Sequence, residues 1–421
     1  MKTCISIPLF SRLTRYNTPA ACAARSVGAS GATRISPAAA SDATNSFHTP
    51  AASFGSWVTD GPLVVSSTPT VTRSPTARRW RSWNTREMNQ QTRLPRFGLY
   101  YDFRNPAFAG RSFARLYAET FEQASWAERD LGFESAWISE HHLAVDGYTP
   151  SPLTLAAALA MRTETMRIGT SVVILPVQNP LRLAEDALTV HAISNGRFML
   201  GVGLGYRAIE FAGFGVPMRE RRARLDAGID ILRAAFTGEQ LDSHGGITIT
   251  PRPEPGEGPE LWIGGFAPAA IRRGAAKADG MVLPIPQLWP QYKAECALVN
   301  RVPRIACAYH WILGDDPEAE LAAAAPFLMH QVNEYGAHGA YGLADQWVPI
   351  TEPAELLRRS PCELMDADKA AAAVVEATLA GVEDVHWWTI FPGEPIERSS
   401  ARLEFFARQV LPRVRQRLGL T

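Results

Sequence analysis

The stretch RIGTSVVILPVQNPLRLAEDALTVHAISNGRFMLGVG, residues 167–203, holds two strand-like runs on either side of one helical segment. The first run, Arg167–Leu175, is apolar on both faces, which is typical of a parallel strand covered by helices. The segment Leu181–Ser194 has helical periodicity and predicts a helix that ends at Asn195-Gly196. The second strand is predicted over Phe198–Val202. A strand, a helix and a second strand in this order form one unit of an α/β fold.

The same alternation continues in both directions from this unit. Further strands are predicted at Phe97–Asp102, Ser135–Glu140, Glu260–Ile263, Gly280–Leu283, Arg304–Leu313 and Val385–Phe391. Further helices are predicted at Ser112–Leu131, with Ser112 as the N-cap, and at Pro152–Met161, Arg219–Phe236, Pro268–Ala278, Gln287–Asn300, Asp366–Ala380 and Glu397–Leu418. About eight strand–helix units favour closure into an α/β barrel of the (β/α)8 TIM type over an open doubly wound sheet.

Two polar or irregular stretches interrupt this rhythm and are predicted as insertions into the barrel. Thr237–Gly258 is rich in Gly and Pro and predicts a surface hairpin. Pro317–Ser360 is less regular and predicts a helix followed by an excursion.

Residues 1–87 differ in composition from the rest of the chain. They are rich in Ala, Ser, Thr, Pro and Arg and hold ten basic residues against three acidic ones. Such a segment cannot bury enough apolar area to offset the entropy lost on ordering, so we expect a disordered N-terminal extension. Three explanations stay open: translation that starts at Met88, a functionless or targeting tail, and an unrecognised role. The folded domain is expected over residues 88–421.

The whole chain has 42 Lys and Arg residues against 42 Asp and Glu residues, so its formal net charge is zero. This removes any whole-molecule argument for binding nucleic acid or an anionic membrane, and no apolar run is long enough to span a bilayer. The five cysteines are widely spaced and form no C-x-x-C pair, which indicates neither a disulfide framework nor a zinc site. We therefore expect inert thiols in a reducing compartment, the cytoplasm.

The reactive groups of such a barrel lie at the C-terminal ends of its strands. Glu140-His141-His142 follows the second strand, where alternation turns one imidazole to the barrel mouth while the other packs or caps. An imidazole at the mouth suits general acid/base work or a hydrogen bond to a bound heterocycle, although histidine pairs more often only pack. Adjacent histidines rarely chelate one ion within a strand, and no third ligand accompanies them. The sequence therefore predicts no metal site and gives poor support to a metallohydrolase.

Three loops after later strands are candidates for ligand binding. Gly201–Tyr206 has the spacing G-x-G-x-G and opens no helix, so the dinucleotide-binding fingerprint does not apply. Its glycines either let a flat ring approach the backbone or only form a tight turn. Gly264–Pro268 leads straight into a helix, whose free N–H groups and positive dipole predict a phosphate site, with an ordinary turn as the alternative. Leu175–Pro180, bracketed by prolines, is either a stiff connection or a binding loop.

Five motifs, taken in order and spacing, resemble those of the bacterial luciferase-like flavin-dependent monooxygenases. The resemblance covers residues 96–418 and is densest between residues 136 and 236. It implies a (β/α)8 barrel, in agreement with the alternation of strands and helices. The five motifs are Trp137–His142, Ile168–Pro176, Asn179–Asp186, Ser194–Phe198 and Gly201–Tyr206.

The resemblance implies an activity as well as a fold. It implies reduced flavin mononucleotide (FMN), supplied by a partner flavin reductase or through NAD(P)H. It further implies reaction with O2 to a flavin C4a-peroxide, which oxygenates a small organic substrate. Two alternatives stay open: a deazaflavin-dependent hydride-transfer oxidoreductase of the same superfamily, and a non-catalytic flavin-binding homologue. Homodimers are common in the family, so a second copy of the chain is a candidate partner.

The resemblance also implies roles for individual positions. His141 matches the active-site histidine, the acid/base beside the flavin peroxide. Ser171-Val172 match a bulge in the third strand, often with a non-prolyl cis peptide, that presses on the isoalloxazine ring. The other cofactor positions are Asn179 at the same mouth, Gly203 and Tyr206 in the glycine-rich turn, and Gly264, Gly265 and Phe266 in the loop beside the phosphate.

Two positions depart from the family pattern, and both concern the phosphate. Many relatives have an arginine where this chain has Leu204. The phosphate loop of relatives often carries a serine or threonine, where this chain has Phe266-Ala267. Arg207 or backbone N–H groups are the expected substitutes.

Overall fold

The computed structural model describes residues 93–254 and 256–420, which form a closed barrel of parallel strands. Neighbouring strands follow the order β3-β2-β1-β11-β8-β7-β6-β5-β4, and an additional pairing of β3 with β5 closes the ring. Because β3 and β4 occupy one position together, the barrel has eight positions, and the predicted (β/α)8 architecture is confirmed. The strands are β1 (Arg96–Tyr101), β2 (Ser135–Ile138), β3 (Arg167–Thr170), β4 (Val173–Ile174), β5 (Phe198–Gly203), β6 (Glu260–Gly264), β7 (Gly280–Val282), β8 (Ile305–Tyr309) and β11 (Asp384–Trp388).

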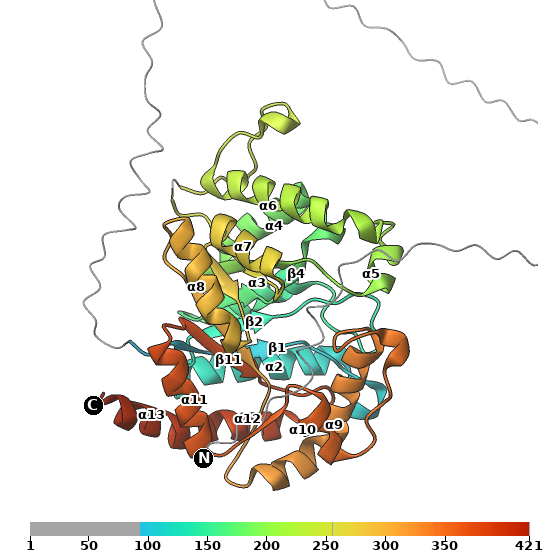
Figure 1. Ribbon diagram of the computed structural model, residues 1–421, viewed down its shortest axis with the longest axis vertical. Helices are drawn as coiled ribbons and strands as arrows, with labels where there is room; N and C mark the ends of the chain where they lie inside the picture. Colours follow the sequence, from blue (N-terminus) through green and yellow to red (C-terminus); the bar gives the residue numbers. More distant parts are fainter. Residues whose placement is uncertain (1–92, 255, 421) are drawn as a thin grey trace, which may run out of the picture. The chain divides into compact units, whose positions relative to one another are not determined.

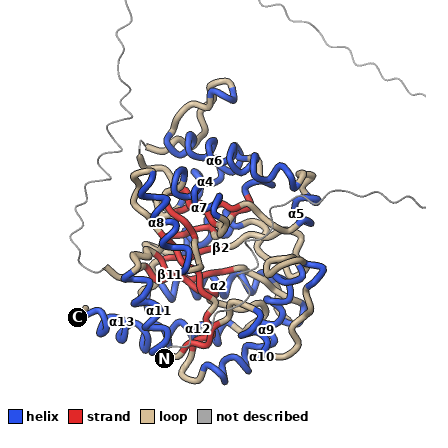
Figure 2. Tube along the Cα trace, viewed as in Figure 1, coloured by secondary structure: helices blue, strands red, loops and turns tan. Residues whose placement is uncertain are grey.

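Helices surround the strands on the outside of the barrel (Figures 1 and 2). The side chain of Ser112 accepts a hydrogen bond from the N–H of Arg115, as predicted for an N-cap. Asn195 and Gly196 take positive φ angles of 52° and 81° and stop the helix before them, also as predicted. The outer helices are α2 (Phe113–Leu131), α3 (Pro152–Arg162), α4 (Pro180–Ile193), α6 (Arg221–Thr237), α7 (Pro268–Lys277), α8 (Trp289–Leu298), α11 (Ala367–Leu379), α12 (Ile396–Phe405) and α13 (Leu411–Leu418).

The segment after β8 is more regular than its sequence predicts. It forms strand β9 (Trp311–Leu313), helices α9 (Pro317–Ala337) and α10 (Pro353–Arg359), and strand β10 (Glu363–Met365), which pairs with β9 in a parallel two-stranded sheet. The predicted helix is α9, which continues through Pro326 for 21 residues, and the predicted excursion corresponds to residues 338–352, whereas α10 and β10 were not predicted. A proline inside a helix removes one backbone hydrogen bond, and packing of Leu321, Leu328 and Val332 in a separate core offsets that loss.

The insertion after α6 is less regular than predicted. Instead of a hairpin with paired strands, the described residues 238–254 contain one isolated antiparallel bridge, between Leu241 and Ile247. Leu241 and Ile249 are buried against the barrel helices, whereas most of the segment is polar and exposed. Too few apolar side chains are available to stabilise a longer hairpin.

The interior of the barrel is filled by large side chains. Tyr100, Trp137, Met199, Trp262, Val282 and Ala306 form a buried cluster, and Val172 and Trp388 pack on it while remaining partly exposed. Because this cluster blocks any passage through the barrel, a ligand has access only at an end. Val172 and Trp388 mark the end where the strands terminate at their carboxyl sides.

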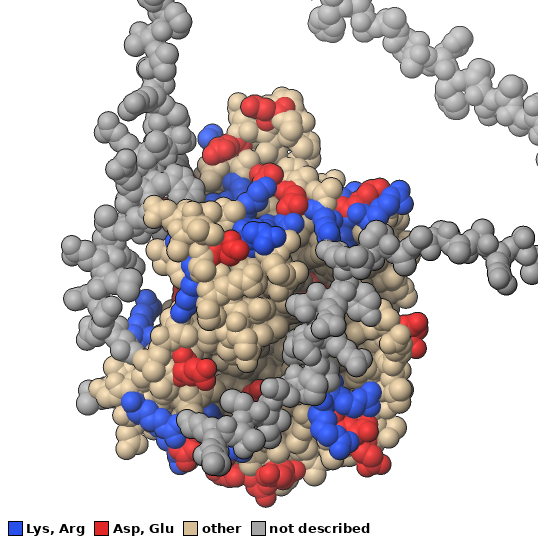
Figure 3. All heavy atoms as spheres, viewed as in Figure 1, with Lys and Arg blue, Asp and Glu red and all other residues tan. Residues whose placement is uncertain are grey.

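The described residues also bear on the predictions about cysteines, membrane spans and charge. Cys296, Cys307 and Cys362 are buried free thiols, and burial raises the pKa of Cys307 and Cys362 to about 12, so these three are inert as predicted. No helix within residues 93–254 and 256–420 is long and apolar enough to cross a membrane. Acidic and basic side chains are interspersed on the face shown in Figure 3. The extension predicted over residues 1–87 lies outside the described residues.

Candidate functional site

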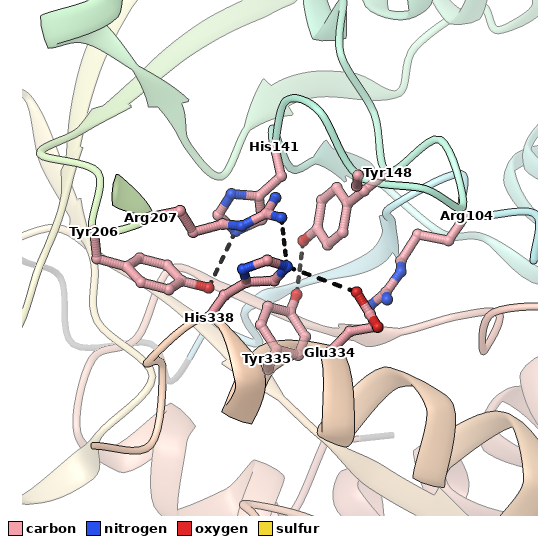
Figure 4. A pocket seen from close by; sticks show the side chains of 9 residues that line it. Arg104, His141, Tyr148, Tyr206, Arg207, Glu334, Tyr335 and His338 are labelled. Atoms are coloured by element: carbon pink, nitrogen blue, oxygen red, sulfur yellow. Dashed lines mark hydrogen bonds and ion pairs between the residues drawn. The ribbon is translucent and has the colours of Figure 1, made fainter. Parts of the chain in front are cut away.

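A pocket opens at the C-terminal mouth of the barrel, where loops from three strands meet helix α9 (Figure 4). His141 enters from the loop after β2, Tyr206 from the loop after β5 and Arg104 from the loop after β1. Helix α9 and the residue after it contribute the opposite wall. The lining residues are Arg104, His141, Ala144, Tyr148, Tyr206, Arg207, Glu334, Tyr335 and His338.

His141 is held between a buried carboxylate and a tyrosine hydroxyl. Its Nδ1 lies 2.8 Å from Oε1 of Glu210, which is fully buried and also accepts the backbone N–H of His142 at 2.9 Å. The hydroxyl of Tyr206 lies 3.3 Å from Nε2 of His141. Because Glu210 is ionised, Nδ1 of His141 carries the ring proton and donates a hydrogen bond to the carboxylate. The lone pair on Nε2 therefore faces Tyr206 and the pocket.

The charge state of this pair follows from burial and from Arg207. Burial lowers the pKa of His141 and outweighs the opposing effect of Glu210, while Arg207 lowers the pKa further. For Glu210, burial acts to raise the pKa, but hydrogen bonds from His141 and from the His142 N–H leave it below its ordinary value. At neutral pH the pair is therefore a neutral imidazole beside a carboxylate, and the imidazole is able to accept a proton.

Arg207 forms hydrogen bonds around the His141–Glu210 pair. Its Nη1 donates to the carbonyl of His142 at 3.2 Å and to Glu210 at 3.3 Å. Its Nη2 lies 2.7 Å from Nε2 of His338, at the end of α9. Arg207 is buried and its terminal nitrogens are occupied. The suggestion that it replaces the missing phosphate arginine is therefore wrong.

The two adjacent histidines diverge, as the strand alternation predicts. His142 packs its ring edge-on against Phe214 at a centroid distance of 4.7 Å and lies 3.4 Å from the carboxylate of Glu140. Within the described residues no group of three His, Cys, Asp or Glu side chains is arranged to hold a metal ion.

The bulge predicted in the third strand lies between β3 and β4, and the Ser171–Val172 peptide bond there is cis. The Tyr100 hydroxyl donates to the carbonyl of Ser171 at 2.9 Å. Across the bulge, the buried carboxylate of Glu140 accepts hydrogen bonds from the Ile174 N–H and from the Gln178 amide. Glu140 is thus a positioning residue, which fixes the bulge from the neighbouring strand.

Val172 occupies the space that the glycines leave open. A Cβ on Gly203 would lie 2.4 Å from Cγ2 of Val172, and a Cβ on Gly264 would lie 2.8 Å from Cγ1. Gly203 therefore makes room for Val172, and its contact with a flat ring stays a prediction. The partly exposed side chains of Val172 and Trp388 instead provide the apolar floor at the mouth.

The loop beside α7 has the features of an anion site built from backbone. Gly265 takes a φ of +154°, and a Cβ there would lie 2.8 Å from Cβ of Ala270. Among the described residues, no hydrogen-bond partner contacts the N–H groups of Phe266 and Ala267, which precede Pro268 at the first position of α7. These N–H groups and the helix dipole suit a phosphate, with Leu204 supplying no charge.

Asn179 has a structural role that the resemblance did not assign. Its side chain is exposed and accepts hydrogen bonds from the N–H groups of Leu181 and Arg182 at 3.0 and 3.3 Å, which makes it the N-cap of α4. Asparagine followed by proline at the first helical position is the sequence signal for this role. Asn179 does not line the pocket that contains His141.

The sequence did not reveal the wall that α9 builds over the mouth. His330 lies 2.8 Å from Asp146, Gln331 donates to Asp102 at 3.1 Å, and the Tyr335 and Tyr148 hydroxyls are 2.7 Å apart. Arg104, absent from the predicted site, donates through Nε to Asp146 at 2.6 Å. The only available signal was the spacing of His330, Gln331, Glu334, Tyr335 and His338 along one helical face, which becomes visible once α9 is recognised as a helix.

A sequence profile described as Luciferase-like monooxygenase matches residues 96–382, which include every strand of the barrel except β11. The chain belongs to the luciferase-like monooxygenase family. One relative in this family is the alkanal monooxygenase alpha chain of Aliivibrio fischeri, 40% identical over 95 residues, which are 23% of this chain and 27% of the relative. The chain spans less than half the length of the curated relatives that head the comparison, between 32% and 49% of them.

Solved structures of luciferase-like proteins share the fold. The oxygenating constituent of 3,6-diketocamphane monooxygenase from Pseudomonas putida, solved in complex with FMN, is 17% identical with a TM-score of 0.59 and covers 76% of this chain and 99% of that chain. An F420-dependent secondary alcohol dehydrogenase, solved with an F420–acetone adduct, is 15% identical with a TM-score of 0.57 and covers 77% and 100%. The shared barrel thus occurs with either cofactor.

Proposed function

We propose that this protein is a flavin-dependent monooxygenase that uses reduced FMN and O2 to oxygenate a small organic substrate. The observation that carries the proposal is the hydrogen bond between the imidazole of His141 and the buried carboxylate of Glu210, which lies at the mouth of a luciferase-like barrel where His141 faces the pocket. A proton-transfer group at the mouth of a barrel whose interior is filled suits chemistry on a cofactor bound at the rim.

The residues at the mouth fit FMN. Val172 and Trp388 present a partly exposed apolar floor on which a planar ring can lie. The N–H groups of Phe266 and Ala267 at the start of α7 are placed to receive the phosphate. When bound, the reduced flavin supplies the two electrons that activate O2.

The chain's own groups would then control protons and water. His141 accepts a proton at Nε2 and returns it, while the Glu210 carboxylate stabilises the positive charge that appears on the ring. Tyr206 orients Nε2 through its hydroxyl. Tyr335 and His338 of the α9 wall cover the pocket, which keeps water from the reacting atoms.

Deazaflavin-dependent hydride transfer is the second candidate. The observation in its favour is the phosphate side of the mouth, where Leu204 stands in place of an arginine and the loop after β6 carries no hydroxyl side chain. The F420-dependent alcohol dehydrogenase has the same fold. A base such as His141 also suits removal of a proton during hydride transfer.

The supply of electrons, the compartment and the assembly belong to the proposal. A flavin reductase or NAD(P)H would provide reduced FMN, and a cytoplasmic location would keep the buried thiols reduced. We include a homodimer in the proposal because homodimers are common in the family.

The test identifies the cofactor first. We expect FMN to be found by mass spectrometry and absorbance in the purified protein, or to bind saturably in a fluorescence titration. Absence of flavin binding in both redox states would overturn the proposal. Anaerobic hydride transfer with deazaflavin, without FMN binding, would select the second candidate.

A further inference from the structure

Arg104 is a buried cation whose position is fixed from behind. Its side chain is 2% exposed and its Nε donates to Oδ2 of Asp146 at 2.6 Å. The guanidinium carbon lies 5.1 Å from the ring centroid of Tyr148 and 5.7 Å from that of Tyr335. Two aromatic faces and one ion pair thus hold the planar group in a single orientation.

The outer edge of this guanidinium has no protein partner. Within the described residues, Nη1 and Nη2 of Arg104 form no hydrogen bond, although the residue lines the pocket with His141 and Tyr206. Arg207 is the other arginine that lines the pocket. Both of its terminal nitrogens already form hydrogen bonds, to Glu210, His142 and His338. Nη1 and Nη2 of Arg104 are not among the buried side-chain atoms that lack a partner, so they face the open space of the pocket, where a bound molecule can supply an acceptor.

We propose that the substrate carries a carboxylate group, which Nη1 and Nη2 of Arg104 bind in bidentate fashion with the rest of the molecule directed toward His141. This inference rests on the proposed function, because it names the substrate class of the same pocket. The fork of the guanidinium matches the two oxygens of a carboxylate, and lysine offers no equivalent geometry.

The surrounding charges accommodate one more anion. Asp146 is already compensated by Arg104, and Nε2 of His330 donates to the same carboxylate oxygen at 2.8 Å. Burial raises the pKa of Asp102 to about 6 against the opposing effect of Arg104, and an anion bound beside Arg104 would raise that pKa further. Glu334 is 39% exposed at the rim, where solvent screens it.

The pocket is small, and its empty volume, open mouth included, is about 210 Å³. Its lining does not include Val172 or Trp388, so the carboxylate site and the apolar floor are separate surfaces of the mouth.

The experiment compares acids with their neutral amides. Calorimetric titration of the purified protein, with and without FMN, uses benzoate and propionate against benzamide and propionamide. We expect the acids to bind about 10- to 100-fold more tightly than the amides, the effect of a charge-assisted bidentate contact. This comparison uses only the wild-type protein, so it does not depend on whether a variant folds.

A pair of variants then assigns the contact. Arg104→Gln should lose the preference for the acids, and Arg104→Lys should retain only part of it. Arg115→Gln, on the exposed side of α2 where Arg115 pairs with Glu119, should keep the full preference. Circular dichroism confirms that each variant retains the barrel.

The binding results distinguish the carboxylate inference from the proposed function. Equal binding of acids and amides, no saturable binding of any acid, or acid binding that survives Arg104→Gln would overturn the inference. Weaker FMN binding but unchanged riboflavin binding in Arg104→Gln would assign the arginine to the flavin phosphate and overturn it as well. Acid binding that depends on Arg104 in a protein that binds no flavin would uphold the inference while the proposed function fails.

Discussion

The carboxylate of Glu210 lies 2.8 Å from Nδ1 of His141 and is completely buried behind it. The two residues come from the loop after β2 and from the short helix α5 (Ala208–Gly213) after β5, so the closed barrel is what brings them together. This pair joins the fold to the proposed chemistry, because it fixes which nitrogen of the imidazole faces the pocket.

Replacing Glu210 should change both the rate and its pH dependence. Glu210 raises the pKa of His141 against the larger effect of burial, so Glu210→Gln should lower that pKa further. We expect the acidic limb of the kcat/KM profile to move to lower pH and kcat to fall by about 10- to 100-fold. Glu122→Gln, at an exposed position on α2, is the control. An unshifted profile would mean that Glu210 does not act through His141.

Replacing His141 separates catalysis from cofactor storage. His141→Ala should retain flavin binding and lose turnover by about 10²- to 10⁴-fold, since the acid/base group is gone. The control is His244→Ala, in the exposed insertion after α6. Steady-state rates with a turnover substrate provide the measurement. Unchanged turnover would remove His141 from the mechanism and favour the non-catalytic homologue.

The close packing of Val172 on the glycines predicts a compensating pair of substitutions. Gly264→Ala places a Cβ 2.8 Å from Cγ1 of Val172 and should lower the free energy of unfolding by about 1–3 kcal/mol. Adding Val172→Ala removes the opposing methyl groups and should recover part of that loss. Urea unfolding of the four proteins in this double-mutant cycle measures the coupling, and strictly additive effects would contradict the contact.

The backbone anion site predicts a selective effect on the phosphate. Gly265→Ala should distort the loop, because a Cβ at this φ of +154° approaches Ala270. We expect FMN to bind about tenfold more weakly while riboflavin, which has no phosphate, binds as before. Fluorescence titration with both flavins measures the ratio. Equal losses for the two flavins would place the phosphate elsewhere.

A carboxylate at the N-terminal end of the barrel predicts acid-sensitive stability. Glu383 bonds to Arg304 at 2.6 Å and to Arg96 at 2.9 Å. Burial acts to raise its pKa, but the two arginines outweigh it and lower the pKa to about 2. The folded state therefore gains stability above the ordinary glutamate pKa and loses it as the pH falls toward 2.

Glu383→Gln tests this sign. The variant should be about 1–3 kcal/mol less stable than the wild type at pH 7. The difference should be smaller at pH 3, because the unfolded wild type binds a proton at Glu383 there while the folded state, with its lowered pKa, does not. Denaturant unfolding at the two pH values gives both differences. A difference that grows on acidification would contradict the assigned pKa shift.

Local sequence patterns were sufficient to predict the barrel. Strand-like runs such as Phe198–Val202, separated by helices with caps and glycine stops, determine a parallel closed sheet because each signal lies within a few residues. The loop Gly264–Phe266 and the bulge at Ser171-Val172 were likewise predictable from short motifs. The failures concern segments whose structure depends on tertiary packing, such as β10, a strand of three residues that pairs with β9.

The composition of the site was less predictable than its location. His141 and Tyr206 carry motif signals, but Arg104, Glu210 and Tyr335 come from segments up to 231 residues apart and meet only after the barrel closes. Gly203 and Asn179 have cofactor roles that stay predictions. Each has a local role, as space for Val172 and as the N-cap of α4, that short motifs do not distinguish from contact with a cofactor.

The central claim is that the barrel mouth holds reduced FMN and protects its reaction with O2 from water. The most direct measurement mixes stoichiometric protein and reduced FMN with O2, and records O2 uptake with an electrode and H2O2 with a peroxidase-coupled dye. We predict that O2 uptake precedes the appearance of H2O2 with the wild-type protein, and that the interval shortens in His141→Ala. Simultaneous uptake and release, as with free FMN, would contradict the account.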